Sequence, residues 1–411
     1  MLPLLSIKQF FRDMRSQKLR TLMTMFGILW GTVSVVLLMA FGTGLQEYQV
    51  KRFKGLGESI TILWPGVTSK PWHGLPRGRR IRLTEDDVVL MKKSLPSIQR
   101  ISPEFSAYSV MLKSHRNNMS AMVAGVWPEF SDMRNLIPQA GGRFINDNDM
   151  AEKRRTVFIG DELGLKLFPG EDPIGQTLQL NGVPFVIVGV MQSKAQNSSY
   201  GGRDTRNAYI ATTTFLGVYN RRYPNDIVVQ SFNPDGMKQT KSDIFRYAAS
   251  RYEFDPGDSE ALANWDTTEG MKFFLTFFGA FRMFLVGIGC LTLITGGIGV
   301  TNIMNVVLEE RTKEIGVKMA LGAKPSFIMG QFMFETALLI ALGGLLGLGL
   351  AIGIIKLYAA INPIKELGTP NLHFIHAVMA VGVLGLVAFL AGFFPARRAS
   401  KLEPVKALKL Y

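Results

Sequence analysis

Residues 302–351 read NIMNVVLEERTKEIGVKMALGAKPSFIMGQFMFETALLIALGGLLGLGLA, which sets a charged segment between two apolar runs. Residues 309–324 (EERTKEIGVKMALGAK) hold seven charged side chains in sixteen positions. The apolar runs on both sides are long enough to cross a hydrocarbon core, which takes roughly 20 residues of helix. The stretch therefore predicts two membrane spans joined by a short charged connector.

Four apolar runs occur in the 411-residue chain, at about residues 22–41, 281–308, 332–358 and 376–395. The first is too long for the apolar part of a signal peptide and lacks a small-residue cleavage site after it, so we expect a retained helix. We predict a membrane α-helical fold with four transmembrane helices and a large extracytoplasmic α+β domain. The expected segments are an amphipathic helix at 1–21, transmembrane helices at 22–45, 271–308, 331–358 and 376–396, an extracytoplasmic domain at 46–270, a cytoplasmic helix at 309–330, an outer loop at 359–375 and a cytoplasmic tail at 397–411. Residues 46–54 and 270–281 are expected to be helical stalks.

The net charge of +14 lies mainly beside the predicted membrane helices. Residues 46–270 hold 28 Lys/Arg against 25 Asp/Glu, whereas residues 1–22 and the tail from Arg397 each carry a net charge of +4. The positive-inside rule therefore places both termini and the charged connector in the cytoplasm. Because this rule accounts for the basicity, we predict no nucleic-acid partner.

The segment 46–270 shows two strand-helix-strand patterns. The first runs from SITIL at 59–63, through a helix capped by Thr84, to a β-like stretch at 98–112. The second runs from 227–232, through helical spacing at 235–250, to Tyr252–Phe254. Two such units predict a ferredoxin-like α+β domain.

An insertion at about 116–224 separates these units and has a mostly β character, with a hairpin signal at Asn181-Gly182. The polar segments 65–80 and 196–206 are expected to be long mobile loops. Arginines gather at the end of the first of these: Arg77, Arg79, Arg80 and Arg82. This run could receive an acidic partner or could be a solvated basic loop.

Sequence signatures of catalysis are missing. The chain contains no GxxxxGK[ST] phosphate-binding loop and no G-x-S-x-G nucleophile motif. Its four histidines and single cysteine, Cys290, show no metal-ligand spacing. We predict no catalytic residue, no metal site and no cofactor in this chain. Asn302, Asn305 and Glu335 lie near the inner ends of the spans, and we interpret Glu335 as an interfacial or ion-paired carboxylate rather than a proton relay, which disfavours ion-coupled transport.

The connector has the spacing of a short helix. Arg311, Glu314 or Ile315, and Lys318 lie within i, i+3 and i+4 reach of one another, with Leu321 continuing the face. Gly322 stands where a helix C-cap is expected, and Pro325 can open the next helix. From these residues alone, the segment could be a simple connector or a docking element.

Residues 302–351 resemble the core of the MacB/FtsX-like ABC transporter permeases, whose second span ends in N-x7-E-R-x-x-E-I-G-[IV]-x-[KR]-A-[LI]-G-A. The chain departs from this pattern by having Met319 before Ala320. Three other stretches also resemble the family: residues 16–44 its first span, residues 157–191 the outer domain of the MacB branch, and residues 393–409 its P-A-x-x-A ending.

This resemblance implies a permease subunit that docks on a cytoplasmic ABC ATPase, which binds ATP and magnesium. No ATPase is fused here, so a separate subunit is expected. The residues that match the family's ATPase-coupling motif are Glu310, Arg311, Glu314, Ile315, Gly316, Lys318, Leu321 and Gly322. The resemblance also implies a bacterial inner-membrane location in contact with lipid, a second permease copy as homodimer or heterodimer, and possible partnership with a periplasmic adaptor and an outer-membrane channel.

Small-residue spacing marks the predicted spans, notably at Gly27, Gly31, Gly343 and Gly347. Such glycines let helices approach closely, either within one bundle or across a dimer interface. The implied function is export of a drug, peptide, siderophore or lipid-linked molecule by ATP-driven movement. The alternatives are mechanical activation of a cell-wall hydrolase without transport, and lipoprotein release.

Overall fold

The computed structural model describes residues 18–196, 199–361, 368–403 and 407. The predicted amphipathic helix at 1–21 therefore lies almost entirely outside the described residues, as do positions 362–367 of the outer loop and most of the tail beyond residue 403. The chain divides into two compact units. We call residues 49–274 the sheet unit, and residues 1–48 together with 275–411 the helical unit.

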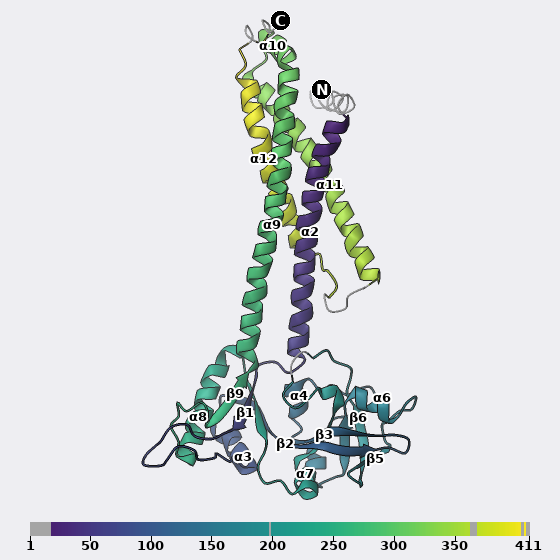
Figure 1. The fold of residues 1–411 in the computed structure, drawn as a ribbon, viewed down its shortest axis with the longest axis vertical. Coiled ribbons are helices and arrows are strands. Elements are labelled where there is room, and N and C mark those ends of the chain that lie inside the picture. Colours follow the sequence, from purple (N-terminus) through teal and green to yellow (C-terminus); the bar gives the residue numbers. More distant parts are fainter. Residues whose placement is uncertain (1–17, 197–198, 362–367, 404–406, 408–411) are drawn as a thin grey trace. The chain divides into compact units, whose positions relative to one another are not determined.

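Four long helices among the described residues carry the four apolar runs: α2 (Lys18–Lys54), α9 (Thr267–Glu310), α11 (Pro325–Ile361) and α12 (Phe374–Ser400) (Figure 1). Each is long and apolar enough to cross a membrane, and the predicted four transmembrane helices are confirmed. Both α2 and α9 continue without a break through the segments expected to be stalks.

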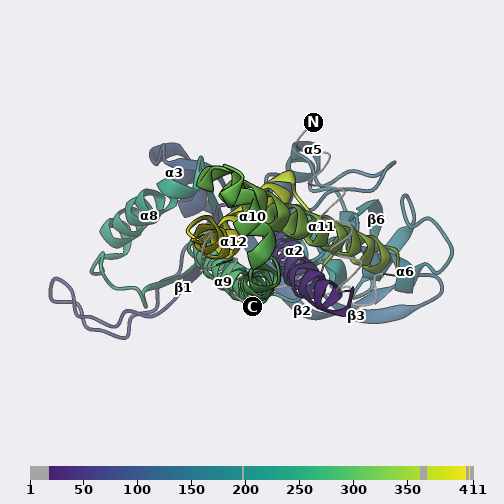
Figure 2. The same ribbon diagram turned by 90° about the horizontal axis from the view of Figure 1, so that it is seen from above.

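A shared apolar core holds the helical unit together. It includes Ile28 of α2, Met304 of α9, Phe332 of α11 and Ala391 of α12, all buried. Ile315 of the short helix α10 (Thr312–Ala320) belongs to the same core. Helix α11 crosses α2 at an angle rather than running parallel to it (Figures 1 and 2). The charged connector is thus packed into the helical unit and is not a free loop.

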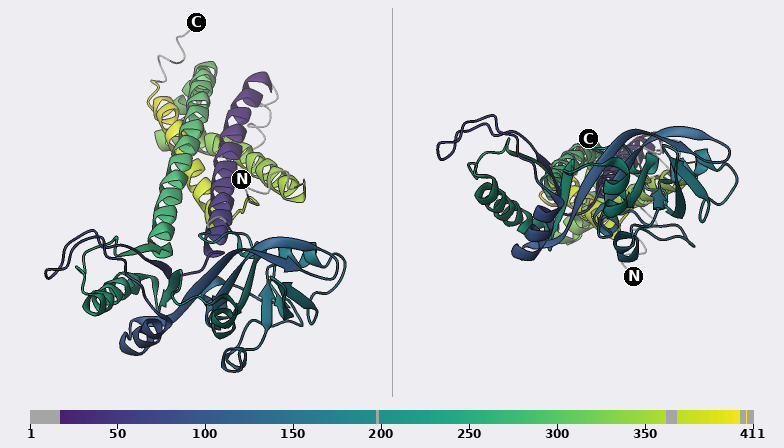
Figure 3. Two further views of the ribbon diagram at one scale, coloured as in Figure 1. Left: turned by 60° about the horizontal axis from the view of Figure 1, so that its bottom comes forward. Right: turned by 90° about the horizontal axis from the view of Figure 1, so that it is seen from below.

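The ferredoxin-like half of the sheet unit has the strand order β2-β8-β1-β9, with antiparallel neighbours throughout. The strands are β1 (Ile60–Pro65), β2 (Ile98–Lys113), β8 (Asp226–Ser231) and β9 (Leu262–Asp266). Helices α3 (Glu85–Ser94) and α8 (Met237–Tyr252) pack on one face of this sheet through Val88, Met91, Ile244 and Ala248 (Figure 3). The predicted α+β class is therefore confirmed.

The last strand of this half was placed wrongly by the sequence pattern. Tyr252 ends α8, and Glu253 adopts the left-handed conformation of a helix C-cap, with φ of 51°. The strand β9 follows ten residues later, at Leu262–Asp266. Its sequence LANWD contains Asn and Asp, which are depleted in strands, so local propensity gave little sign of it.

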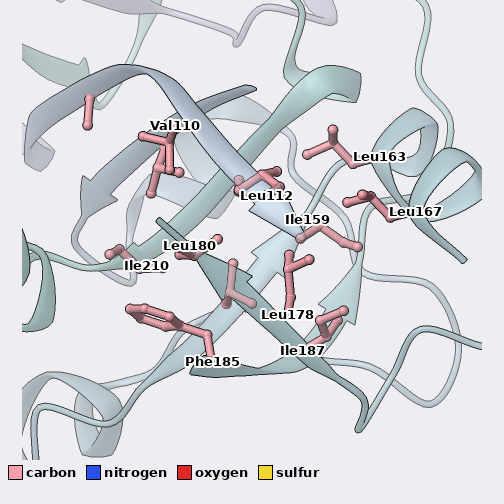
Figure 4. Close-up of a cluster of buried hydrophobic side chains, with 14 of the residues drawn as sticks. Val110, Leu112, Ile159, Leu163, Leu167, Leu178, Leu180, Phe185, Ile187 and Ile210 are labelled. Atoms are coloured by element: carbon pink, nitrogen blue, oxygen red, sulfur yellow. The ribbon is translucent and has the colours of Figure 1, made fainter. Parts of the chain in front are cut away.

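The inserted segment closes into a barrel with the second half of β2. The strands β3 (Asn118–Val126), β4 (Thr156–Ile159), β5 (Thr177–Leu180), β6 (Val183–Val190) and β7 (Asn207–Ala211) run in the order β3-β7-β4-β6-β5-β2, and β2 also pairs with β3. Leu112, Leu178, Phe185, Ile187 and Ile210 fill its interior (Figure 4). The Asn181-Gly182 hairpin forms as predicted, with positive φ at both residues.

The insertion also contains short helices that the mostly β prediction did not include. They are α4 (Phe130–Arg134), α5 (Asp147–Ala151), α6 (Asp161–Leu167), α7 (Thr212–Tyr219) and the 3-10 turn η1 (Asp204–Arg206); a second turn, η2 (Pro234–Gly236), precedes α8. These helices lie in the connections between strands. Phe215 of α7, together with Leu163 and Leu167 of α6, belongs to the barrel core.

Both segments expected to be loops contain ordered contacts. Residues 66–80 fold back as a ribbon, in which Val67 and Arg80 form a β-bridge and the Thr68 N–H donates to Arg79 O at 2.9 Å. In the described part of 196–206, Asp204 is almost completely buried and starts η1. These contacts left no sign in the sequence, because both segments are polar.

Candidate functional site

The candidate coupling site is the turn-helix-turn that joins α9 to α11. Helix α9 ends at Glu310, and Arg311 leaves helical geometry before α10 begins at Thr312. Gly322 has φ of +93°, a conformation that favours glycine, and it follows the C-cap residue Leu321. Pro325 then opens α11. The predicted short helix is therefore present, with shorter bounds than 309–330.

An ion pair fixes the start of α10 to α11. Arg311 Nη1 lies 3.0 Å from Glu335 Oε2, and the Gln331 amide donates to the other carboxylate oxygen at 3.0 Å. Both charged side chains are largely buried, so removing either would leave an uncompensated charge. Glu335 is thus ion-paired, in agreement with its interpretation from the sequence. Its pairing connects it to the candidate coupling site, a contact that the family pattern alone did not indicate.

The inner face of α10 carries Ile315 and Gly316, which are buried. A side chain at Gly316 would meet Cβ of Ala407 at 2.8 Å, so this glycine lets the tail of the chain lie against α10. Glu314 and Lys318 pair with each other at 2.7 Å on the flank of the helix. These contacts fix the orientation of α10 within the helical unit.

The outer face of α10 presents apolar side chains that the described residues leave exposed. Leu321 is 83% exposed and Val317, four residues earlier, is 46% exposed. Glu310, at the end of α9, and Lys313 are exposed charges near them. An apolar centre with a charged rim is the composition of a protein-binding patch. We call Glu310, Lys313, Val317 and Leu321 the α10 patch.

The four glycines predicted to pack helices lie at contacts within the helical unit. Gly27 and Gly31 of α2 face Gly296 and Leu293 of α9. Gly343 and Gly347 of α11 face Ile28, Leu29 and Thr32 of α2. Helix α2 is therefore in close contact with both α9 and α11.

A buried ionic cluster in the sheet unit was not predicted from the sequence. Arg134 donates to Asp204 at 2.7 Å, and Lys194 pairs with the other oxygen of Asp204 at 2.7 Å. Tyr200 donates to Glu104 at 2.6 Å and lies 4.6 Å from the Arg134 guanidinium. Burial would raise the pKa of Asp204, but the charges of Arg134 and Lys194 outweigh this effect and lower it.

Glu104 and Asp226 are cross-strand partners on β2 and β8, and their carboxyl groups hydrogen-bond to each other. Burial, followed by the charge of Glu104, raises the pKa of Asp226 well above its usual range. Burial also raises the pKa of Glu104, against the opposing charge of Arg134. One proton shared by this pair would balance the cluster, because Glu104, Asp226 and Asp204 then carry two negative charges against Arg134 and Lys194.

We expect Asp226→Asn to remove part of the pH dependence of sheet-unit stability. A pKa raised by folding gives stability that is fully present below the unfolded pKa and is lost as pH rises through the folded pKa. The wild-type free energy of opening should thus fall by up to about 1.4 kcal/mol per pH unit above about pH 4, and the variant should show a shallower slope. Amide hydrogen exchange of β2 and β8 in the full chain, from pH 5 to 8, measures this slope.

The matched control for this prediction is Asp243→Asn on α8. Burial would raise the pKa of Asp243, but hydrogen bonds from Ser97, Gln239 and Arg246 outweigh this effect and lower it. Its contribution is therefore constant above about pH 5, and the slope should stay that of the wild type. Equal slopes in wild type and Asp226→Asn would contradict the shared proton.

The fold and the connector define a membrane protein of four apolar helices with a folded domain between the first and the second. Residues 21–246 match the MacB-like periplasmic core domain, and residues 286–404 match the FtsX-like permease C-terminal domain. The first match covers more than half of the chain. The chain therefore belongs to the MacB/FtsX-like family of ABC transporter permeases, as an inner-membrane protein with an extracytoplasmic segment.

Similar proteins include two curated export proteins. The chain is 28% identical over 407 residues to the macrolide export ATP-binding/permease protein MacB of Bdellovibrio bacteriovorus, covering 98% of this chain and 61% of that protein. It is 30% identical over 408 residues to the pyoverdine export ATP-binding/permease protein PvdT of Pseudomonas putida, covering 98% and 59%. The chain thus spans about 60% of the length of these relatives. The crystal structure of the periplasmic region of MacB from Actinobacillus actinomycetemcomitans has a TM-score of 0.42 and 17% identity, covering 56% of this chain and 98% of that one.

Proposed function

We propose that this permease transmits ATP-driven movement of an ABC ATPase to its extracytoplasmic domain, and that this movement exports a substrate. The observation that carries the proposal is the α10 patch. Leu321 and Val317 are exposed on a helix whose other face is fixed by the Arg311–Glu335 pair and by Ile315. A docking element that passes on movement needs an exposed apolar surface and a firm attachment to the membrane helices, and the exposure of Leu321 and the Arg311–Glu335 pair support this role for α10.

The helices α2 and α9 support mechanical transmission. Helix α9 runs from Thr267 to Glu310 as one element. Its first residues belong to the sheet unit, and its last residue lies next to the start of α10. A push on α10 would pass into α11 through the Arg311–Glu335 pair. It would pass into α9 through the backbone, because Arg311 directly follows the last residue of α9. The most apolar 18-residue window of each membrane helix contains at most two charged residues, which gives no sign of a polar substrate path among the described residues. We therefore infer that work is done on the extracytoplasmic side.

The charge distribution supports the proposed orientation, with both termini and α10 in the cytoplasm. The names of the relatives include ATP binding and the export of macrolides and of pyoverdine. By this likeness we propose that ATP and magnesium are bound by an ABC ATPase, not by the described residues of this chain. We also propose a second permease copy in the complex. A periplasmic adaptor and an outer-membrane channel would complete an export path.

Leu321→Asp is expected to weaken ATPase docking strongly. A charge at the centre of an apolar contact removes an anchor worth about 2 kcal/mol or more, or roughly thirtyfold in affinity. The measurement is co-purification of the ABC ATPase with the tagged permease, together with ATP hydrolysis in lipid nanodiscs. The ATPase is identified by its nucleotide-binding motifs.

Leu165→Asp is the matched control for the docking experiment. Leu165 is 72% exposed on α6 of the sheet unit, so the same substitution should leave ATPase binding unchanged. Gel-filtration elution of both variants at the wild-type volume shows that folding is intact. Wild-type co-purification and hydrolysis in Leu321→Asp would refute the docking assignment.

A further inference from the structure

Two exposed arginines stand at the end of the ribbon (residues 66–80) and just after it. Arg80 and Arg82 are exposed, whereas Ile81 and Leu83 between and after them are buried in the core beneath α3 and α8. The Ile81 N–H donates to Gly66 O at 3.0 Å. Both guanidinium groups are therefore held on the same side of a fixed piece of backbone.

The segment before β8 forms the opposite wall of a pocket. Its Asn225 is fixed by a bond from its N–H to Glu104 O at 2.9 Å and by a bond from the Ser106 N–H to its Oδ1 at 2.8 Å. Arg82 lies 5.3 Å from the centre of the Tyr223 ring, and Arg222 lies 5.6 Å from it. The pocket between the two walls has a volume of about 370 Å³.

The charge in this pocket is uncompensated within the described residues. The residues that line it include two arginines and no carboxylate: Pro65, Arg80, Ile81, Arg82, Leu83, Tyr223, Pro224 and Asn225. In the part of the chain that the structure describes, no Asp or Glu oxygen lies within 4.0 Å of Arg80, Arg82 or Arg222. The neighbouring Arg79 differs, because it donates to the carbonyl oxygens of Tyr252 and Glu253 and so serves the fold.

We propose that this arginine pocket, lined by Arg80, Arg82, Tyr223 and Asn225 with Arg222 beside the Tyr223 ring, binds a phosphate group. Guanidinium groups bind phosphate through paired, charge-assisted hydrogen bonds. A dianion would also relieve the repulsion between Arg82 and Arg222, which both lie near the Tyr223 ring. The volume suits a small ligand or the head of a larger one. The phosphate could come from a soluble compound or from a lipid headgroup. The site goes beyond the proposed coupling function and does not depend on α10.

Binding of inorganic pyrophosphate to the full chain in detergent, measured by calorimetry, tests this proposal. We expect saturable binding by the wild type that is at least about tenfold weaker in the double variant Arg80→Gln/Arg82→Gln. Arg77→Gln is the control, because Arg77 is exposed on the same ribbon but does not line the pocket. Equal binding in the wild type and the double variant, or none in either, would overturn the proposal.

A second arm of the experiment identifies the source of the phosphate. The chain is placed in nanodiscs of phosphatidylcholine with or without phosphatidic acid. If phosphatidic acid weakens pyrophosphate binding by the wild type and leaves the residual binding by the double variant unchanged, the result supports a lipid headgroup. Unchanged binding supports a soluble phosphate compound. Binding of a Glu-rich peptide without any binding of pyrophosphate would overturn the phosphate assignment in favour of an acidic protein partner.

Discussion

Replacing Arg134 by methionine is expected to destabilise the sheet unit by about 3–5 kcal/mol, because it breaks a buried ion pair and leaves Lys194 as the only cation of Asp204 among the described residues. The Arg134 side chain is 3% exposed and pairs with Asp204, which is also buried. Methionine keeps much of the apolar volume, so the effect reports the lost charge rather than a large cavity. Glu104 would lose the same cation. In the wild type, the charge of Arg134 counteracts the burial that raises the pKa of Glu104.

Hydrogen exchange of the β2, β7 and β8 amides in the full chain measures this loss as a free energy of opening. Arg206→Met is the control, since Arg206 pairs with Glu162 at 2.6 Å but is 55% exposed. An exposed pair contributes about 0–1 kcal/mol, so this variant should exchange almost as the wild type does. Equal protection in the two variants would show that the buried cluster is not a main source of stability.

The membrane helices and half of the sheet unit could be predicted because their signals are local. Apolar length identifies each span, and the Thr84 cap with its acidic first turn identifies α3. The capping box that Thr84 and Asp87 form has the geometry this pattern indicates. Barrel closure was not predictable in this way. It depends on β2 pairing with both β3 and β5, which is a property of distant segments.

The ionic cluster shows the same limit for side chains. Glu104, Arg134, Lys194, Asp204 and Asp226 are separated by many residues, and each one alone looks like an ordinary surface charge. The available signal was weak: Glu104 and Asp226 stand at strand positions where buried residues are expected. In the candidate coupling site, the family pattern indicated only which segment to consider. The structure was needed to show that Ile315 faces inward, that Leu321 faces outward, and that Glu335 is the partner of Arg311.

Gly347→Leu is expected to separate α11 from α2 and to lower the stability of the helical unit by about 1–3 kcal/mol or more. A Cβ at this position would lie 2.7 Å from Leu29 O and 2.8 Å from Thr32 Cβ. The backbone oxygen cannot rotate away as a flexible side chain can, so the helices must move apart. Unfolding by SDS titration of the full chain, followed through the fluorescence of Trp30 on α2, measures the change.

Gly349→Leu separates packing from the other effects of the substitution. Gly349 lies on the same helix, and nothing lies within 4 Å of a Cβ built there, so leucine should gain helix propensity without a clash. A large loss in Gly347→Leu with little or no loss in Gly349→Leu would assign Gly347 to packing within one chain. If both variants unfold as the wild type does, but the Gly347 variant no longer forms dimers, the glycine instead serves contact between two copies. The sequence left these two roles open, and the contacts with Leu29 and Thr32 favour the first.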